Sequence, residues 1–560
     1  MHRLPVIRSL LVAVAVTGLL SARQPVRAKH AMVVSEEPLA TDVGVHVLQS
    51  GGNAVDAAVA VGFALAVTHP YAGNLGGGGF MLVRMADGRT SFVDFRERAP
   101  AKATRDMYLG PDGEPTNASI EGWRAAGVPG TVRGLEYAHR KWGSRPWSEL
   151  VAPAADLARN GFVLSYNEAK SISGETRLRR FPESKHVYLN DGLPFEAGDL
   201  FIQPDLARTL SRIARDGARD FYEGETARIL ADQMALHDGL ITLDDLKNYT
   251  VAERKPLQGC YRGFEIWTSP PPSSGGIGVL QMLAMLEPSS YEKSGAGSAA
   301  VIHYVAEAMR RYYADRSTWL GDPDFSSVPV AALLDPAYIA RRRATIDPQH
   351  ATSSELLNPG VFPPSAEPAQ TTHYSIVDGE GNAVSLTYTL NGAFGSGVTV
   401  PGLGVLLNNE MDDFAAKPGQ PNMFGLVQGE SNAIAPGKRP LSSMTPTIVT
   451  RSGKLYMVLG GPGGGHIVTS VLQTVLNVVD FHLNVQDAVD RPRFHHQWKP
   501  DKLMLEPGFS PDTIQLLEGR GHVVEAEGPS SLIEAIMVED SGWLAGAADA
   551  GRSNAKAAGF

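Results

Sequence analysis

Residues 371–391 read TTHYSIVDGEGNAVSLTYTLN, a pattern that is typical of a β-hairpin. Residues alternate over 371–377 and again over 383–389 with the period of a β-strand. The segment between them, DGEGN, has the composition of a turn. The sequence therefore predicts two antiparallel strands joined by a short turn, and the rest of the chain has to supply the sheet around them.

The segment before this hairpin has a different character. Residues 348–370 read PQHATSSELLNPGVFPPSAEPAQ, which predicts an exposed, mobile segment. A chain break before Thr371 would place a hydroxyl and a free α-amine on one residue. Because an α-amine has a pKa of about 7.7–8.0, it can accept the hydroxyl proton while Oγ attacks a carbonyl. The alternative is that Thr371 and Thr372 are two ordinary threonines that open a strand.

Further elements are predicted upstream. A glycine pair at 51–52 separates helices over 40–50 and 54–67, with Asn53 as the N-cap of the second. The second helix is apolar on all faces, which indicates burial. A glycine-rich loop leads into strands over 80–83 and 91–95. Other helices are predicted over 204–215 and 299–320, and residues 270–276 (PPPSSGG) form a rigid entry to a further helix that runs to about residue 287.

The composition and charge of the chain exclude several classes of protein. The chain has 560 residues, 43% apolar and 20% charged, so wholesale disorder is excluded. Its length indicates several domains or one large layered domain. Acidic residues outnumber basic ones by 60 to 50 and no Lys/Arg-rich run is present, which argues against a nucleic-acid partner. The single cysteine, Cys260, excludes an intrachain disulfide and a multi-cysteine metal cluster.

The first 28 residues have the pattern of a secretory signal peptide. Two arginines precede a short apolar run over 10–20, and small residues allow cleavage after Ala22 or Ala28. An uncleaved anchor is the alternative, but the run is shorter than the roughly 20 residues that span a bilayer. We expect a protein exported to the periplasm or secreted, with no membrane attachment after signal removal.

The hairpin segment resembles the start of the small subunit of gamma-glutamyltranspeptidases, which are N-terminal-nucleophile hydrolases. The same resemblance extends, in order along the chain, to GGNAVDAAVAVGFALAVTHPYAGNLGGGGF (51–80), DFRERAPAKATRDMY (94–108), PPPSSGG (270–276), YADRSTWLGDPDF (313–325), LLNNEMDDF (406–414), KRPLSSMTPTIV (438–449) and GGPGGGH (460–466). It implies an α+β fold, a four-layer αββα sandwich whose two stacked sheets are mostly antiparallel.

The resemblance also implies a precursor that cuts itself between Gln370 and Thr371. The parts would be a signal peptide (1–28), a large subunit (29–370) and a small subunit (371–560), the last two forming one intertwined heterodimer. Thr371 Oγ would form a γ-glutamyl ester with glutathione or related amides, then pass the acyl group to water, an amino acid or a dipeptide. Such acyl transfer needs no metal or organic cofactor.

The family's site residues match positions in this chain. Arg96, Ser442 and Ser443 correspond to the group that holds the substrate α-carboxylate, for which a planar guanidinium and hydroxyl donors are suited. The other matches are Asn391, Glu410 and Asp413 for the α-ammonium, Gly463 and Gly464 for the two backbone N–H donors of an oxyanion hole, and Thr389, which hydrogen-bonds the nucleophile and assists maturation.

Each match also has an ordinary structural interpretation. Arg96 lies between Asp94 and Glu97 and could form a surface ion pair. The serine pair at 442–443 could cap a turn, Asp413 could be a helix N-cap, and the two glycines could form a plain tight turn. We prefer the functional set because all matches hold the family's spacing at once.

Three positions depart from the family pattern. Phe424 lies where many bacterial members have a tyrosine on a lid over the substrate, so one lid hydrogen bond is lost. Glu410 replaces the glutamine of some members, and a carboxylate should hold an ammonium at least as well. His466 replaces a more usual arginine after the glycine run. Outside the site, we expect Asp315 and Arg316 to form a buried ion pair.

Two other functions remain open. Some relatives act as glutaryl-cephalosporin acylases or poly-γ-glutamate depolymerases; a glutaryl group has no α-ammonium, so Glu410 and Asp413 favour a γ-glutamyl substrate. The other function is that of an uncleaved, non-catalytic binding protein of the same fold, against which Thr371 and Thr389 argue. The sequence contains no G-x-S-x-G elbow, H-E-x-x-H helix or dinucleotide-binding glycine spacing.

Overall fold

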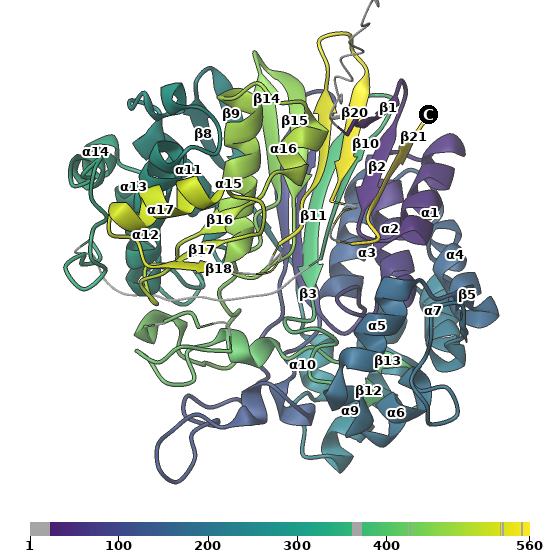
Figure 1. The fold of residues 1–560 in the computed structure, drawn as a ribbon. Coiled ribbons are helices and arrows are strands. Elements are labelled where there is room, and N and C mark those ends of the chain that lie inside the picture. The colour runs from purple at the N-terminus through teal and green to yellow at the C-terminus, as the bar shows by residue number, and fades with distance from the viewer. Residues whose placement is uncertain are drawn as a thin grey trace, which may run out of the picture.

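The computed structural model describes residues 23–360, 372–423, 425–427, 429–526, 528, 531–549, 551 and 553–560. Gln370, Thr371, Phe424 and the apolar run of the signal segment lie outside the described residues. Two seven-stranded sheets lie face to face in the middle of the molecule, and helices cover the outer face of each (Figure 1). This arrangement is the αββα sandwich that the family resemblance implied.

The first sheet contains the predicted hairpin. Its strands, in spatial order, are β21 (Lys556–Gly559), β2 (Met32–Ser35), β10 (Thr372–Val377), β11 (Ala383–Thr389), β3 (Gly78–Arg84), β4 (Thr90–Phe95) and β7 (Ala252–Arg254). All neighbours are antiparallel. Between β10 and β11, Asp378 Oδ1 accepts from the Asn382 amide at 2.9 Å and closes the DGEGN turn.

The second sheet is also antiparallel. Its strands are β1 (Val26–Ala28), β20 (Leu544–Ala548), β19 (Glu534–Val538), β15 (Lys454–Gly460), β14 (Thr447–Arg451), β9 (Phe264–Thr268) and β8 (Leu257–Tyr261). Residues from both sides of position 371 therefore contribute to both sheets, so the described parts of the two proposed subunits are intertwined.

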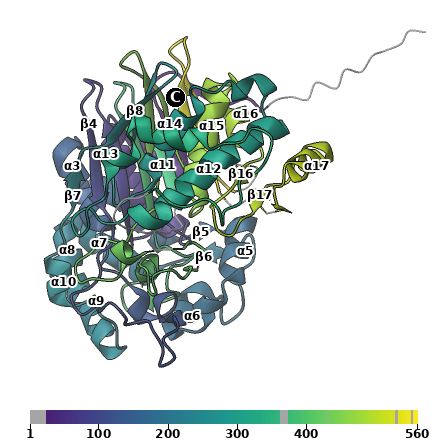
Figure 2. The same cartoon turned by 90° about the vertical axis from the view of Figure 1, so that its left-hand side faces the viewer.

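Helices form the two outer layers. The first sheet is covered by α1 (Pro38–Gln49), α2 (Ala54–Thr68) and α3 (Thr131–Trp142), and α4 (Trp147–Asn160) and α7 (Pro204–Asp216) pack outside them. Every residue of α2 is buried, as predicted, and Asn53 and Asp56 form its capping box. The second sheet is covered by α11 (Gly275–Leu286), α12 (Ala299–Trp319), α15 (His466–Val479) and α16 (Val485–Asp490), of which α11 and α12 face the viewer in Figure 2.

Smaller elements complete the described chain. They are α5 (Tyr166–Gly174), α6 (Pro182–Tyr188), α8 (Ala218–Glu223), α9 (Glu225–Leu236), α10 (Leu243–Lys247), α13 (Val330–Leu333), α14 (Pro336–Ala344) and α17 (Pro511–Gly519), with short strand groups β5 (Phe162–Val163) and β6 (Leu200–Phe201), β12 (Thr399–Val400) and β13 (Val405–Leu406), and β16 (Phe494–His495), β17 (Leu503–Leu505) and β18 (Val524–Ala526). Among the helices described, none is long and apolar enough to cross a membrane.

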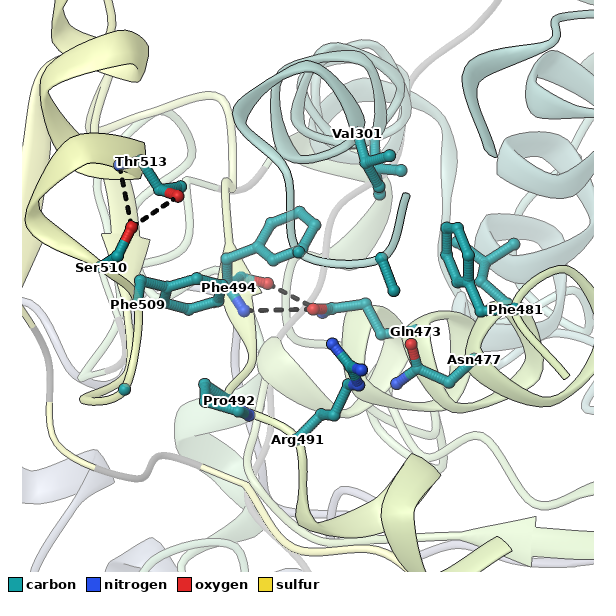
Figure 3. A pocket seen from close by; sticks show the side chains of 15 residues that line it. Val301, Gln473, Asn477, Phe481, Arg491, Pro492, Phe494, Phe509, Ser510 and Thr513 are labelled. Atoms are coloured by element: carbon teal, nitrogen blue, oxygen red, sulfur yellow. Dashed lines mark hydrogen bonds between the residues drawn. The ribbon is translucent and has the colours of Figure 1, made fainter. Parts of the chain in front are cut away.

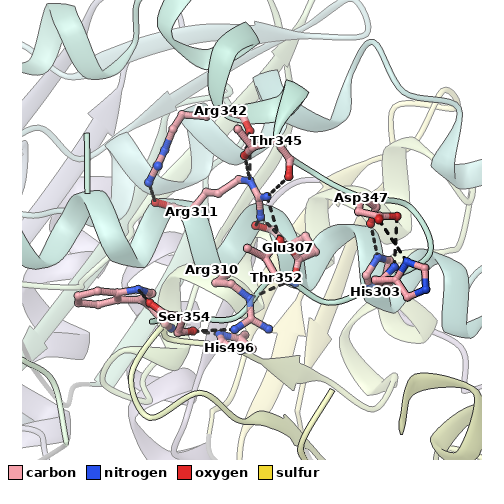
Figure 4. A network of polar contacts seen from close by, with 12 residues as sticks. His303, Glu307, Arg310, Arg311, Arg342, Thr345, Asp347, Thr352, Ser354 and His496 are labelled. Carbon is pink, nitrogen blue, oxygen red and sulfur yellow. Dashed lines mark hydrogen bonds and ion pairs between the residues drawn. The ribbon is translucent and has the colours of Figure 1, made fainter. Parts of the chain in front are cut away.

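The segment over 348–360 makes polar contacts with α12. Glu307 on α12 accepts from the Thr352 amide at 3.1 Å and, with Arg310 and Arg311, forms a buried network (Figure 4). Arg310 also donates to Ser354 Oγ at 2.6 Å. Most of residues 348–360 are exposed or half-buried, as expected, whereas Ser354 and Leu357 are buried. Residues 361–370 lie outside the described residues.

Several strands begin or end at the same edge of the sandwich. In the first sheet β10 begins and β2 and β11 end there; in the second sheet β15 ends and β19 begins. The two sheets touch at this edge, where Ser375 Oγ donates to the Glu534 carbonyl at 3.1 Å. The turns and chain ends that gather here build the candidate site.

Candidate active site

The first residues of β10 are fully buried at this edge. His373 and Ser375 share the face that looks toward the second sheet, because strand side chains alternate. The His373 ring hydrogen-bonds Thr387 Oγ1 at 2.9 Å and Ser375 Oγ at 3.0 Å. Burial lowers the pKa of His373 to about 3, so this ring is neutral at physiological pH. Only glycine fits at position 460, since a Cβ there would lie 2.3 Å from the ring.

The glycine turn that follows β15 presents unpaired backbone donors. Gly463 and Gly464 have φ values of 131° and 58°, which glycine adopts without strain. Neither amide hydrogen is donated to a described residue. The turn leads directly into α15, and Tyr313 fixes it by donating to the Gly465 carbonyl at 2.5 Å. A helix N-terminus with free N–H groups favours negative charge, so the turn can stabilise an oxyanion.

Thr389 is the last residue of β11, and Asn391 follows two residues later. The Thr389 carbonyl accepts from Asn74 Nδ2 at 2.8 Å, and its Oγ1 accepts from the Asn391 amide at 2.7 Å. Asn391 adopts a left-handed φ of 72°, which asparagine tolerates. Its Nδ2 donates to the Asn409 carbonyl at 2.9 Å, and its Oδ1 accepts from no described residue. Asn391 Oδ1 is therefore a buried acceptor without a donor among the described residues.

Arg96 lies at the centre of a buried cluster of charged residues. Its guanidinium donates to Glu410 Oε1 and to Asp413 Oδ2, and a third carboxylate, on Glu97, lies 3.6 Å from Nη1. All four side chains are fully buried. The surface ion pair considered for Arg96 is therefore wrong. Asp413 ends a short 3-10 helix rather than beginning one, so the N-cap interpretation is wrong too.

Three carboxylates around one guanidinium leave the cluster with an excess of acceptors. Burial raises the pKa of Asp413 and that of Glu97, and the Glu410 carboxylate raises both further. Burial opposes the charge on Arg96, but Glu410 and Asp413 outweigh it and raise its pKa. Both oxygens of Glu97, Glu410 Oε2 and Asp413 Oδ1 accept no hydrogen bond from a described residue. Buried acceptors without donors suit an ammonium ligand.

The serine pair lies beside Arg96. The Pro440 and Leu441 carbonyls accept from the Arg96 guanidinium at 3.2 and 2.8 Å, and Ser442 and Ser443 follow directly. Ser442 Oγ accepts from the Met444 amide at 3.2 Å, so the turn-capping contact considered for this pair is present. Its own hydroxyl hydrogen is donated to no described residue, and it can therefore serve a carboxylate as well.

The sequence analysis gave no role in the site to Glu97 and assigned the wrong partner to Arg316. Glu97 adjoins Arg96 in the motif DFRERAP, and adjacency was the only signal for it. Arg316 donates to Ser443 Oγ at 3.1 Å, whereas Asp315 pairs with Arg342 at 2.6 Å. The predicted ion pair between Asp315 and Arg316 is therefore wrong, because consecutive side chains of a helix point in different directions.

The structure thus gathers most of the predicted site residues at one edge of the sandwich, from Arg96 after β4 to the glycine turn after β15. Thr371 lies outside the described residues, immediately before β10. His466 begins α15, and its ring lies against that of His495, with centroids 3.9 Å apart and the ring planes tilted by 35°. Within the described ranges, no three His, Cys, Asp or Glu side chains are arranged to hold a metal ion.

A separate cavity of about 260 Å³ lies between α12, α15 and the loop before α17 (Figure 3). Phe494, Phe509 and Val301 line it together with Gln473, whose amide is already paired with the backbone of Phe494 at 2.8 and 3.1 Å. None of the site residues described above contributes to its lining. The cavity is therefore distinct from the candidate site.

Comparisons with known proteins agree with this geometry. A family model described as gamma-glutamyltranspeptidase matches residues 40–559. The glutathione hydrolase proenzyme of Escherichia coli strain K12 is 50% identical over 528 residues, covering 94% of this chain and 91% of that one. A cephalosporin acylase structure from Bacillus halodurans matches with a TM-score of 0.85 at 27% identity and covers 99% of both chains. The Helicobacter pylori gamma-glutamyltranspeptidase structure has a TM-score of 0.57 at 42% identity, over 64% of this chain and 97% of that one. The chain therefore belongs to the gamma-glutamyltranspeptidase family.

Proposed function

We propose that the chain is the precursor of a self-cleaving γ-glutamyltransferase that also hydrolyses glutathione. Thr371 Oγ attacks the Gln370 carbonyl, the acyl group shifts from the Thr371 nitrogen to its oxygen, and water hydrolyses the resulting ester. The products are a large chain that ends at Gln370 and a small chain of 190 residues, 371–560. The new α-amine of Thr371 is the base that the mature enzyme uses.

In the mature enzyme the same hydroxyl acts on a γ-glutamyl amide. The Thr371 amine takes the Oγ proton as Oγ bonds to the γ-carbonyl carbon, and the carbonyl oxygen becomes an oxyanion facing the Gly463 and Gly464 amides. The ammonium then gives its proton to the leaving nitrogen, which departs as cysteinylglycine when glutathione is the donor. Water, an amino acid or a dipeptide next attacks the ester and releases Thr371.

The observation that carries this proposal is the buried excess of acceptors around Arg96. A γ-glutamyl head group brings one carboxylate and one ammonium. The carboxylate would meet Ser442 and the Arg96 guanidinium, which would have to exchange a contact with Glu410 or Asp413 to bind it. The ammonium would meet the oxygens of Glu410, Asp413 and Asn391 that accept from no described residue. A glutaryl group has no ammonium and would leave these oxygens buried without donors, which costs about 1–3 kcal/mol for each group. This asymmetry favours γ-glutamyl transfer over the acylase alternative.

We also propose export to the periplasm or beyond, with the signal peptide removed after Ala22 rather than Ala28. The strand β1 (Val26–Ala28) pairs with β20 at the edge of the second sheet, and Ala28 is buried there. Cleavage after Ala28 would remove this strand, whereas cleavage after Ala22 leaves it intact.

Substitution Thr371→Ala tests the proposed chemistry. The variant should remain one polypeptide on a denaturing gel and release no p-nitroaniline from γ-glutamyl-p-nitroanilide, whereas the parent protein should give two chains and a coloured product. A Thr371→Ala variant that still splits into two bands would contradict the assignment. A parent protein that stays whole and inactive would support the non-catalytic alternative instead.

A further inference from the structure

The cavity of about 260 Å³ between α12, α15 and the loop before α17 has no part in the proposed function. One part of its wall consists of aliphatic side chains from α12 and α15 and of three phenylalanine rings: Val301, Val305, Leu476, Phe481, Phe494 and Phe509. We call it the aromatic cavity. Rings on several sides can surround the apolar part of a small ligand and remove it from water.

Two sets of contacts hold the walls of the aromatic cavity in place. Gln473 Nε2 donates to the Thr469 and Phe494 carbonyls at 2.9 and 2.8 Å, and its Oε1 accepts from the Phe494 amide at 3.1 Å, so Phe494 is tied to α15. Gly508 has a φ of 122°, and a Cβ there would lie 2.6 Å from Pro492 Cγ. Because glycine has no Cβ, the loop before α17 can pack closely on the segment after α16. The fold therefore builds this space.

The polar part of the wall carries a single charge. Arg491 is the one charged side chain among the described residues that line the cavity. In Figure 3 its guanidinium is directed toward Gln473 and Asn477, and the phenylalanine rings lie around this group. A Cβ added to Gly297, before α12, would lie 3.6 Å from Arg491 Nη1. With no carboxylate in the described lining, the charge of Arg491 makes the cavity attractive to an anion.

The uncharged polar groups of the lining bond within the protein. Asn477 Nδ2 donates to the Ala488 carbonyl at 3.1 Å and so joins α15 to α16. Ser510 Oγ donates to Thr513 Oγ1 at 3.0 Å and accepts from the Thr513 amide at 3.2 Å, as the N-cap of α17. These groups therefore shape the cavity, and the charge that distinguishes one ligand from another comes from Arg491.

We infer that the aromatic cavity is a binding site for a small aromatic monocarboxylate, separate from the candidate active site. The planar guanidinium of Arg491 can donate two parallel hydrogen bonds to a carboxylate. The ring of the ligand can pack edge to face on the phenylalanines, as Phe494 and Phe509 do on each other with centroids 6.3 Å apart and planes at 70°. Drug-sized ligands occupy roughly 300–1,000 Å³, so this smaller space suits one ring on a short chain.

The binding test uses three probes that separate the ring from the charge. Phenylacetate has both, phenylacetamide has the ring without the charge, and acetate has the charge without the ring. A ligand-observed NMR titration of the purified protein should give saturable binding of phenylacetate in the millimolar range or tighter, as expected for a ligand of about ten non-hydrogen atoms. Phenylacetamide and acetate should each bind about 10-fold more weakly or not at all.

The variant Arg491→Gln removes the charge and keeps a polar side chain of similar length. It should weaken phenylacetate binding by about 10-fold or more and leave phenylacetamide binding little changed, because only the carboxylate loses a charged partner. The matched control is Arg140→Gln. Arg140 is an exposed arginine of α3 that does not line the cavity, so the affinity for phenylacetate should stay as in the parent protein.

Three results would overturn the inference. The first is the absence of saturable phenylacetate binding in the millimolar range. The second is equal binding of phenylacetate and phenylacetamide, since the charge would then have no role. The third is unchanged phenylacetate affinity in Arg491→Gln, because the anion would then occupy another site, the candidate active site included.

A second measurement does not depend on the folding of Arg491→Gln. In crystals of the parent protein with 4-bromophenylacetate, the anomalous signal of bromine should lie in the aromatic cavity beside Phe494 and Phe509; bromine found only elsewhere would overturn the inference. The proposed function fails separately. A parent protein that stays uncut and inactive would refute self-cleavage, yet it could still bind phenylacetate, because no lining residue takes part in the proposed chemistry.

Discussion

Replacing Asp413 by asparagine tests how the site distinguishes a γ-glutamyl group from a glutaryl group. Asp413 is fully buried, its Oδ2 accepts from Arg96, and its Oδ1 is free to meet the substrate ammonium. Asparagine keeps the shape and an acceptor but removes the charge. A hydrogen bond to a charged group contributes about 1.5–3 kcal/mol, which corresponds to about 10–150-fold in kcat/KM.

The assay compares two anilides that differ only in the ammonium. We expect Asp413→Asn to reduce kcat/KM for γ-glutamyl-p-nitroanilide by about 10–150-fold while that for glutaryl-p-nitroanilide changes much less. The matched control is Asp412→Asn: this neighbour accepts from Ser119 Oγ at 2.8 Å and has no contact with Arg96, so the ratio of the two substrates should not change. An equal loss on both substrates in Asp413→Asn would refute the contact between Asp413 and the ammonium.

Three further predictions follow from other parts of the structure. Gly463→Ala should lower kcat by about 100-fold or more, because a φ of 131° disfavours any side chain and the oxyanion donor moves; undiminished turnover of the processed variant would contradict this. Glu307→Gln should reduce the free energy of unfolding by about 3–5 kcal/mol, since Arg311 stays buried without its carboxylate and Arg310 keeps only that of the partly exposed Asp501; an unchanged melting temperature would argue against it. Burial and then His303 lower the pKa of His522 to about 3, so the unfolded chain binds a proton that the folded one refuses. His522 should therefore contribute a loss of stability of about 1.4 kcal/mol per pH unit from about pH 6.5 toward 3, in addition to that of His373, and His522→Gln should reduce the slope in acid melts by this amount.

The local parts of the fold were predictable because their signals are local. Alternation over 371–389 predicted β10 and β11, and Asn53 before an apolar run predicted the start of α2. Those patterns depend on contacts a few residues apart. The strand β19 was not predicted by itself: the turn at Asp540–Gly542 signals its hairpin with β20, but its pairing with β15 joins segments that lie far apart in the sequence.

The site was only partly predictable because its contacts join distant segments. Arg96 meets Glu410 and Asp413 across 314 and 317 residues of chain, and no periodicity reports such a pair. The resemblance to a family supplied those three positions. It supplied no role for Glu97, whose carboxylate lies 3.6 Å from the Arg96 guanidinium in the folded chain.

The central claim is that an internal threonine becomes a chain start that carries both nucleophile and base. Intact-mass analysis with N-terminal sequencing of the purified, active protein tests it most directly. The prediction is two polypeptides, of which the smaller begins Thr-Thr-His-Tyr-Ser-Ile and spans 371–560. One unbroken polypeptide that still releases p-nitroaniline from γ-glutamyl-p-nitroanilide would contradict it.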